Sequence, residues 1–263
     1  MANILNQIVA RKKTEVQAAK NKNSYTKLEE SEYFNRQPYS FREFLLDTSR
    51  TGIIAEFKRK SPSKGIINDQ VKVKKVTQAY AAAGASALSV LTDPTFFMGK
   101  KSDLVQARRA NQIPVLRKDF MIDEYQIIEA KALGADIILL IAAILSPQEI
   151  KSMAALAKNL GLSVLLEVHN LEELERSLNP QLDAIGVNNR NLADFTVSVD
   201  TSFTLIKSIP KEFLKVSESA ISNPETIRQL KEAGFNGFLI GENFMKEADP
   251  GEAMKEFVGK ISP

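Results

Sequence analysis

An eightfold alternation of short apolar runs and amphipathic helical stretches is the feature that most constrains the fold of this chain. Each run is rich in aliphatic or β-branched residues, and most of the stretches that follow carry apolar residues at helical spacing. The runs are residues 52–57, 87–91, 113–116, 136–141, 163–166, 184–187, 213–216 and 237–240. Gly84, Gly134, Gly161 and Gly234 each end a helical stretch shortly before the next run, a position typical of helix C-caps.

Runs that are apolar throughout are buried on both faces, which indicates a parallel sheet covered by helices. Eight consecutive strand and helix units favour a closed (β/α)8 TIM barrel. An open doubly wound sheet is the alternative, but the chain lacks both glycine-rich phosphate-loop motifs of that class. Ile4, Leu5 and Ile8 begin a different, purely helical pattern. We therefore expect an N-terminal helical extension, residues 1–50, packed on a catalytic barrel, residues 51–263, as a single domain overall.

Charge and cysteine content exclude several classes of partner. The 35 Lys and Arg residues nearly balance the 32 Asp and Glu residues, so neither nucleic acid nor an anionic membrane is an expected partner. The chain has no cysteine and one histidine, which excludes a disulfide framework and argues against a metal site. Its longest apolar run, residues 137–145, is too short to span a bilayer. We expect a cytoplasmic monomer or weak homo-oligomer that binds a small molecule and needs no cofactor.

Polar side chains at the ends of the runs are the candidates for chemistry, because barrel active sites lie at the C-terminal ends of the strands. The two-residue period of a strand places Glu56 and Lys58 on one face. Lys118, Glu167 and Asn188 end three further runs. The alternative is that these groups form ion pairs closing the core. Burying several charges costs several kcal/mol each unless they are well paired, so the set favours a proton-transfer site.

A second group of residues indicates an anion site. Residues 60–65 follow the first run, Ser219 follows the seventh and Gly241 opens the loop after the eighth. The loops after strands seven and eight commonly bind phosphate in barrel enzymes. Solvated surface loops are the alternative.

Three other features are interpreted as structural. Arg108 and Arg109, and the basic residues 11–13, are expected on solvated helix faces. His169 is interpreted as a structural residue at the end of a strand rather than as the catalytic base.

Six motifs, in this order, closely resemble the indole-3-glycerol-phosphate synthase family of tryptophan biosynthesis, over essentially the whole chain. They are EFKRKSPSKG at 56–65, LRKDF at 116–120, LLEVH at 165–169, GVNNRNL at 186–192, SES at 217–219 and LIGE at 239–242. The resemblance implies a lyase that uses neither metal nor cofactor. It would close the ring of 1-(2-carboxyphenylamino)-1-deoxyribulose 5-phosphate, a small phosphorylated substrate, and release carbon dioxide and water.

The resemblance also implies residue roles. Lys118 would be the general acid in ring closure, and Lys58 would hold the substrate carboxylate and act as acid in the dehydration. Glu56 and Glu167 would supply the bases, and Asn188 would position the substrate. Ser219 completes the expected catalytic set.

The residues expected to bind substrate come from the loops and the apolar wall. Those that would pack against the anthranilate ring are Phe97, Phe120, Leu139, Ile141 and Leu192. Those expected around the phosphate, the sugar and the wall of the site are Ser61, Arg190, Glu218, Ala220, Gly241 and Glu242. Lys100 and Asn243 depart from the family pattern and are expected at the rim of the site.

Two other functions remain as alternatives. Phosphoribosylanthranilate isomerase is a barrel of the same pathway, but in its usual form it needs a catalytic cysteine, which this chain lacks. A barrel that binds phosphate ligands without catalysis would leave the two lysines and two glutamates unexplained.

Overall fold

The computed structural model describes residues 4–191 and 196–261, and its eight main strands form a closed parallel barrel. The strands are β1 (Ile53–Phe57), β4 (Ala87–Leu91), β5 (Val115–Lys118), β6 (Ile137–Ile141), β7 (Ser163–Val168), β8 (Ala184–Asn188), β9 (Leu214–Glu218) and β10 (Gly237–Ile240). Each strand pairs with the next along the chain, and β10 closes the ring against β1. The (β/α)8 barrel and all eight strands predicted from the sequence are confirmed.

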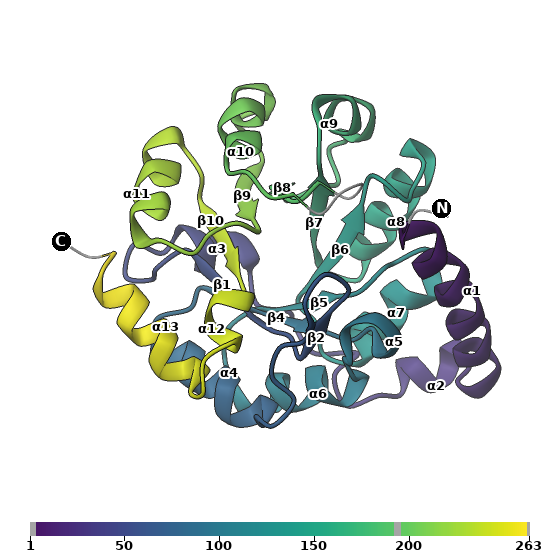
Figure 1. The fold of residues 1–263 in the computed structure, drawn as a ribbon. Coiled ribbons are helices and arrows are strands. Elements are labelled where there is room, and N and C mark those ends of the chain that lie inside the picture. Colours follow the sequence, from purple (N-terminus) through teal and green to yellow (C-terminus); the bar gives the residue numbers. More distant parts are fainter. Residues whose placement is uncertain (1–3, 192–195, 262–263) are drawn as a thin grey trace.

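Helices surround the barrel (Figure 1). They are α1 (Ile4–Lys22), α2 (Tyr25–Glu29), α3 (Phe41–Leu46), α4 (Val73–Ala82), α5 (Pro94–Phe97), α6 (Lys101–Ala110), α7 (Glu124–Ala132), α8 (Pro147–Asn159), α9 (Leu171–Ser177), α10 (Asp200–Leu205) with the 3-10 turn η1 (Ile206–Ser208), α11 (Pro224–Ala233), α12 (Glu242–Met245) and α13 (Pro250–Gly259). A short hairpin, β2 (Lys60–Ser61) and β3 (Gly65–Ile66), follows β1. No helix in the described part of the chain has the length and apolar character of a membrane span.

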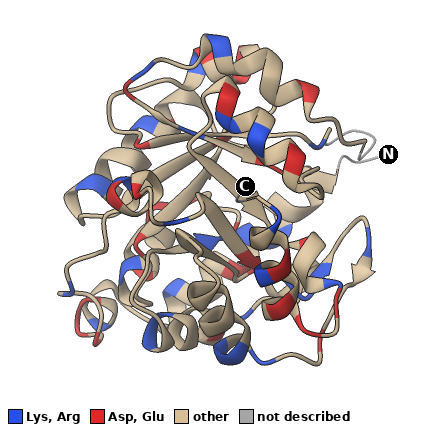
Figure 2. Ribbon diagram, turned by 90° about the vertical axis from the view of Figure 1, so that its left-hand side faces the viewer, with Lys and Arg blue, Asp and Glu red and all other residues tan. Residues whose placement is uncertain are grey.

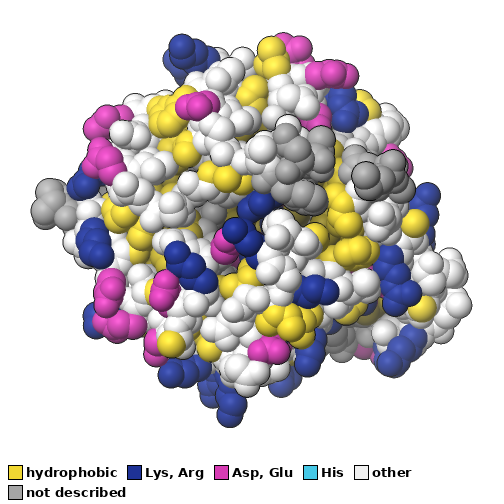
Figure 3. Space-filling model, in the orientation of Figure 1, with side chains coloured by type: hydrophobic (Ala, Val, Ile, Leu, Met, Phe, Trp, Pro, Cys, Tyr) yellow, Lys and Arg dark blue, Asp and Glu magenta, His cyan; other side chains and the backbone are white. Residues whose placement is uncertain are grey.

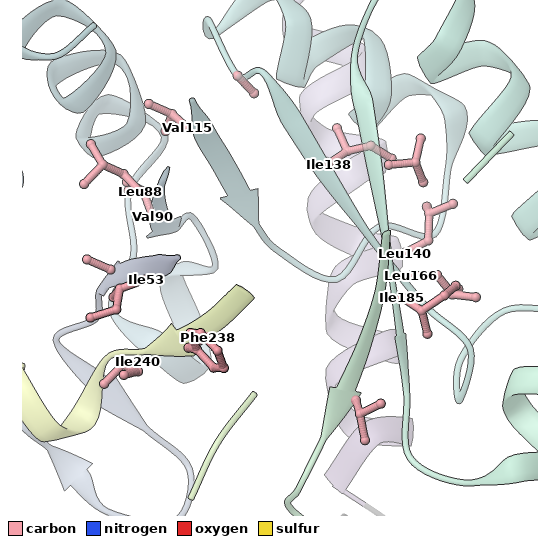
Figure 4. Packing of buried hydrophobic residues seen from close by; sticks show 14 of the residues in the cluster. Ile53, Leu88, Val90, Val115, Ile138, Leu140, Leu166, Ile185, Phe238 and Ile240 are labelled. Atoms are coloured by element: carbon pink, nitrogen blue, oxygen red, sulfur yellow. The ribbon is translucent and has the colours of Figure 1, made fainter. Parts of the chain in front are cut away.

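The strands bury alternate residues in two separate cores. Side chains such as Ile53, Ile138 and Phe238 point outward and pack against the helices (Figure 4). Their neighbours in sequence, such as Ile54 and Leu139, point inward. Because the period of a strand is two, Glu56 lies on the same inward face as Ile54, and Lys118 on the same inward face as Leu116. The inward face of the strands therefore becomes polar at their C-terminal ends.

Helix α3 closes the opposite, N-terminal end of the barrel. Phe41 and Leu45 are buried in the inner core together with strand residues, and Gly237 of β10 leaves room for Leu45. Ser40 begins the helix, and its hydroxyl accepts a hydrogen bond from the backbone N–H of Glu43. The inner core therefore has an apolar floor, and its polar residues lie at the other end.

The prediction that Arg108, Arg109 and the basic residues 11–13 lie on solvated helix faces is wrong at two positions. Charges of both signs are spread over the ribbon (Figure 2), but Lys12 and Arg108 are buried. The ammonium of Lys12 lies 2.8 Å from a carboxylate oxygen of Asp93 and 2.8 Å from one of Asp119. Arg108 forms a 2.7 Å ion pair with Asp136. Buried partners on other elements, invisible in the local sequence pattern, draw these two cations inward.

Candidate active site

A cavity opens at the C-terminal end of the barrel and collects most of the residues predicted from the sequence. Acidic, basic and hydrophobic side chains lie together at the centre of this face (Figure 3). The predicted residues that line the cavity are Glu56, Lys58, Ser61, Phe97, Lys118, Phe120, Leu139, Ile141, Glu167, Asn188, Arg190, Glu218, Ser219 and Glu242. Ala220, Gly241 and Asn243 line an adjoining cavity, which shares five of those residues. Leu192 lies outside the described residues, and Lys100 lines neither cavity.

Lys118 occupies the centre of the charged group. Its ammonium lies 2.9 Å from Glu167 Oε2 and 2.8 Å from Glu218 Oε2. Burial alone would lower the pKa of Lys118, but the charges of Glu167, Glu218 and Glu56 outweigh it and raise the pKa. Lys118 is therefore held as an ammonium, with a proton available to donate.

The two carboxylates beside Lys118 differ in their affinity for protons. Burial alone would raise the pKa of Glu167, but Lys118 and His169 outweigh it and lower the pKa. Asn188 also donates a 3.0 Å hydrogen bond to Glu167 Oε1. Burial raises the pKa of Glu218, and repulsion by Glu167 adds to the rise. One site thus holds an ionised carboxylate and a carboxyl that binds a proton more readily.

Gly186 makes room for Glu218. A Cβ at this position of β8 would overlap Glu218 Oε1, which is buried and has no hydrogen-bond partner among the described residues. The side chain of Glu218 therefore reaches Lys118 across the space that a larger residue at position 186 would fill. Glu218 was predicted to bind substrate, but its contact with Lys118 places it within the charged group.

Lys58 and Glu56 form a second ion pair at the C-terminal end of β1. Lys58 Nζ lies 2.8 Å from Glu56 Oε1, and Ser89 donates a 3.2 Å hydrogen bond to Glu56 Oε2. Burial alone would raise the pKa of Glu56, but Lys58 and Lys118 outweigh it and lower the pKa. Gly241 allows this packing, because a Cβ there would lie 2.7 Å from Glu56 Oε1.

Apolar side chains form the other wall of the cavity. The rings of Phe97 and Phe120 are tilted by 38° with centroids 5.9 Å apart, and Leu139 and Ile141 of β6 also line the cavity. Walls of this kind, with a few polar groups opposite, are typical of sites for small molecules.

Helix α1 also contributes to the cavity, which sequence reasoning missed. Ile4, Leu5 and Ile8 line it beside the strand residues. Their helical spacing predicted an amphipathic helix, but no local signal distinguishes packing on the barrel wall from packing across its mouth. The N-terminal segment is therefore part of the site.

The loop after β9 has an unusual backbone. Ser219 and Ala220 both have positive φ angles, 67° and 59°, in the left-handed region that L-residues rarely adopt. The amide of Asn189 donates hydrogen bonds to Ser219 O at 3.2 Å and to Ser217 Oγ at 3.0 Å. Asn189 was not among the predicted site residues, although it adjoins Asn188 in the motif. Such strain of about 1–3 kcal/mol per residue persists only where neighbours hold it.

Side chains from two other loops meet at this rim. The hydroxyl of Ser61 accepts a 3.2 Å hydrogen bond from the backbone N–H of Lys64. Arg190 lies 3.5 Å from Ser63 Oγ and 3.9 Å from Glu242. No group of three or more acidic or histidine side chains in residues 4–191 and 196–261 is placed to hold a metal ion.

Known proteins resemble this chain over nearly its full length. The family model described as indole-3-glycerol phosphate synthase matches residues 5–257. A protein of that name from Bacteroides thetaiotaomicron is 47% identical over 99% of this chain and 100% of its own length. Its counterpart from Laribacter hongkongensis is 45% identical over 97% of this chain and 98% of its own. Among solved structures, a chain of the tryptophan synthase a2b2 complex from Pyrococcus furiosus matches 80% of this chain and 97% of its own, with a TM-score of 0.60 and 16% identity, which supports the fold alone.

Proposed function

The chain belongs to the indole-3-glycerol phosphate synthase family, and we propose that its barrel mouth closes the ring of 1-(2-carboxyphenylamino)-1-deoxyribulose 5-phosphate to give indole-3-glycerol phosphate. The observation that carries the assignment of roles is the contact of Lys118 with Glu167 and Glu218, in a cavity that also holds the Lys58–Glu56 pair. We place the reaction in the cytoplasm, because a charged phosphate ester does not cross membranes unaided.

Ring closure is assigned to Lys118. The ring carbon that carries the carboxylate attacks the ketone carbon, and the carbonyl oxygen takes a proton from Lys118 as the carbon–carbon bond forms. An alkoxide is a stronger base than an amine, so the transfer is downhill even from a lysine that its carboxylate neighbours hold charged. Carbon dioxide then leaves, and its bonding electrons restore the aromatic ring.

Dehydration is assigned to Lys58 and Glu167. The new hydroxyl leaves as water with a proton from Lys58, and Glu167 removes a proton from the carbon attached to nitrogen, which creates the indole double bond. Glu167 is a better candidate base than Glu218, because its pKa is lowered and its carboxylate is ionised. It lies between Lys118 and Asn188, and Glu167 pairs with Ile141 in the strand register. Glu56 orients Lys58. The complete reaction takes up one proton from solvent.

Binding is divided between two sides of the cavity. We assign the anthranilate ring to the wall of Phe97, Phe120 and Ile141. The phosphate is assigned to the loops that carry Ser61 and Ser219, where the two cavities meet. A phosphate held at this rim points the reacting carbons toward the lysines.

The test compares two site variants with exposed counterparts. Lys118→Ala should lower kcat and kcat/KM together, by about 10²-fold or more, because it removes a proton transfer made only in the transition state. Glu167→Gln should lose turnover while still binding indole-3-glycerol phosphate. Lys151→Ala and Glu172→Gln, both exposed, are the controls.

Steady-state kinetics by indole fluorescence, beside thermal unfolding of each variant, separates catalysis from stability. A folded Lys118→Ala protein with near-normal kcat would refute the assignment.

A further inference from the structure

The chain's one histidine lies between two carboxylates behind the charged group. His169 Nδ1 lies 3.1 Å from Glu173 Oε2 on α9, and its Nε2 lies 3.4 Å from Glu167 Oε1. The side chain is 9% exposed. His169 follows β7 two residues after Glu167, so the strand period places both on the same face.

The hydrogen-bond inventory at His169 favours a donor at both ring nitrogens. Glu173 Oε2 already accepts a 2.8 Å hydrogen bond from the backbone N–H of His169, and an ionised carboxylate has no proton to donate. Nδ1 must therefore carry the proton that it shares with Glu173. Nε2 is buried, lies 3.4 Å from Glu167 Oε1, and has no hydrogen-bond partner among the described residues. In a neutral ring its lone pair would lie beside a carboxylate oxygen.

We propose that His169 is a positioning residue that bridges Glu173 and Glu167 as an imidazolium, and so fixes the orientation of Glu167 and keeps it ionised for proton transfer. The proposal rests on the role of Glu167 as base assigned above. Glu173 is itself held by Asn170, whose side chain lies 3.3 Å from Glu173 Oε1 and accepts from its backbone N–H at 2.9 Å.

The charges around His169 support this state. Burial would lower the pKa of His169, but the hydrogen bond to Glu173 and the charges of Glu167, Glu173 and Glu218 outweigh it and raise the pKa. The cations nearby act through these carboxylates: Lys118 of β5 contacts Glu167 and Glu218, and Arg176 of α9 interacts with Glu173.

The sign of the pH effect follows from that raised pKa. The imidazolium is present below the pKa of His169 in the folded enzyme and is lost as the pH rises through it. Loss of the proton removes a positive charge beside Glu167 and leaves two acceptors facing each other. Turnover should therefore decline on the alkaline side.

A direct test observes the imidazole itself. Because the tag-free protein has one histidine, its ring gives a single set of NMR signals, whose 15N shifts report the protonation of both nitrogens. We expect protonation of both, with a pKa above the ordinary value of about 6.5, and a lower pKa in Glu173→Gln. Glu172→Gln is the exposed control on the same helix. A ring that is neutral at pH 6, or a pKa unchanged in Glu173→Gln, would overturn the proposal.

Two substitutions test the consequence for turnover. In His169→Gln the side-chain amide places an N–H donor near the position of Nε2, but the amide cannot titrate. In His169→Asn the amide places its N–H donor near the position of Nδ1, so Glu167 has no donor from this residue. We expect His169→Gln to retain kcat within about 3-fold and His169→Asn to lose about 10-fold or more, with KM nearly unchanged in both.

The pH profile distinguishes His169 from Glu218, which also has a raised pKa. Any decline of kcat at alkaline pH that is due to Glu218 remains in His169→Gln. The part of the decline that is due to His169 disappears in that variant. Equal losses in both variants, or losses that only follow Tm, would contradict the positioning role. The NMR titration needs no turnover, so an inactive wild-type protein would refute the proposed function while the titration still decides the state of His169.

Discussion

The buried ion pairs of Lys12 lead to a quantitative prediction about the N-terminal helix. The ammonium lies 2.8 Å from Asp93, Asp119 and Glu15, and its side chain is 4% exposed. Lys12→Met keeps the apolar stem but removes the charge, so buried carboxylates lose their shared cation. Breaking a buried ion pair in this way destabilises by about 3–5 kcal/mol.

Proton uptake sets an independent limit on that loss. The charge of Lys12 helps to lower the pKa of Asp119, although burial alone would raise it. Without Lys12, Asp119 can avoid the free-energy cost of a buried negative charge by binding a proton. From the ordinary pKa of 3.8, this costs ~4 kcal/mol at pH 7 and ~1.6 kcal/mol at pH 5, at about 1.4 kcal/mol per pH unit. The destabilisation should therefore shrink as the pH falls.

Urea and thermal unfolding of Lys12→Met at pH 7 and pH 5, relative to the wild-type protein at each pH, measure this difference. We expect Tm to fall by about 10 °C at pH 7 and by less than half of that at pH 5. Lys13→Met, the neighbouring exposed lysine of the same helix, is the control and should change Tm little. Equal effects of the two substitutions, or a loss for Lys12→Met that does not shrink at pH 5, would refute the reasoning.

Three further predictions concern the cavity. Ser61→Ala should raise KM more than it lowers kcat, and should weaken inhibition by inorganic phosphate; unchanged phosphate inhibition would contradict its assignment. Gly186→Ala should displace Glu218 and lower kcat at least about 10-fold, whereas Gly259→Ala, where a Cβ meets nothing within 4 Å, should be silent in the same assay. Prolonged chelation should leave activity unchanged, because two lysines supply the positive charge; rescue of a lost activity by a divalent ion would refute this.

The barrel could be predicted because its signal is local and repeated. A parallel strand buried on both faces is apolar throughout, and glycine ends helices where a left-handed residue is needed; Gly84, Gly134, Gly161 and Gly234 all have positive φ. The predicted strands at 113–116 and 163–166 ended too early, since Lys118 and Val168 continue them. When the last residues of a strand face an active site they are polar, so a prediction based on apolar runs ends the strand too early.

The charged half of the site was predictable for the same geometrical reason. Strand ends in a barrel converge, so Glu56, Lys118 and Glu167 meet wherever the fold is correct. Contacts between segments distant in the chain were not predictable. The local pattern around Lys12 does not reveal Asp93, and the amphipathic pattern of α1 does not reveal which surface of the barrel it covers.

Helix α1 is synthesised before the segments that hold it in place. Lys20 of α1 bonds to Asp123, 103 residues further along the chain. Strand β1 is complete only when β10 arrives, since Ile53 pairs with Phe238. At about 5–20 residues per second, a ribosome needs on the order of ten seconds or more between the synthesis of Ile53 and that of Phe238. During that interval one edge of β1 has no partner strand on the nascent chain, so we expect aggregation during translation to lower the yield of this protein in cells.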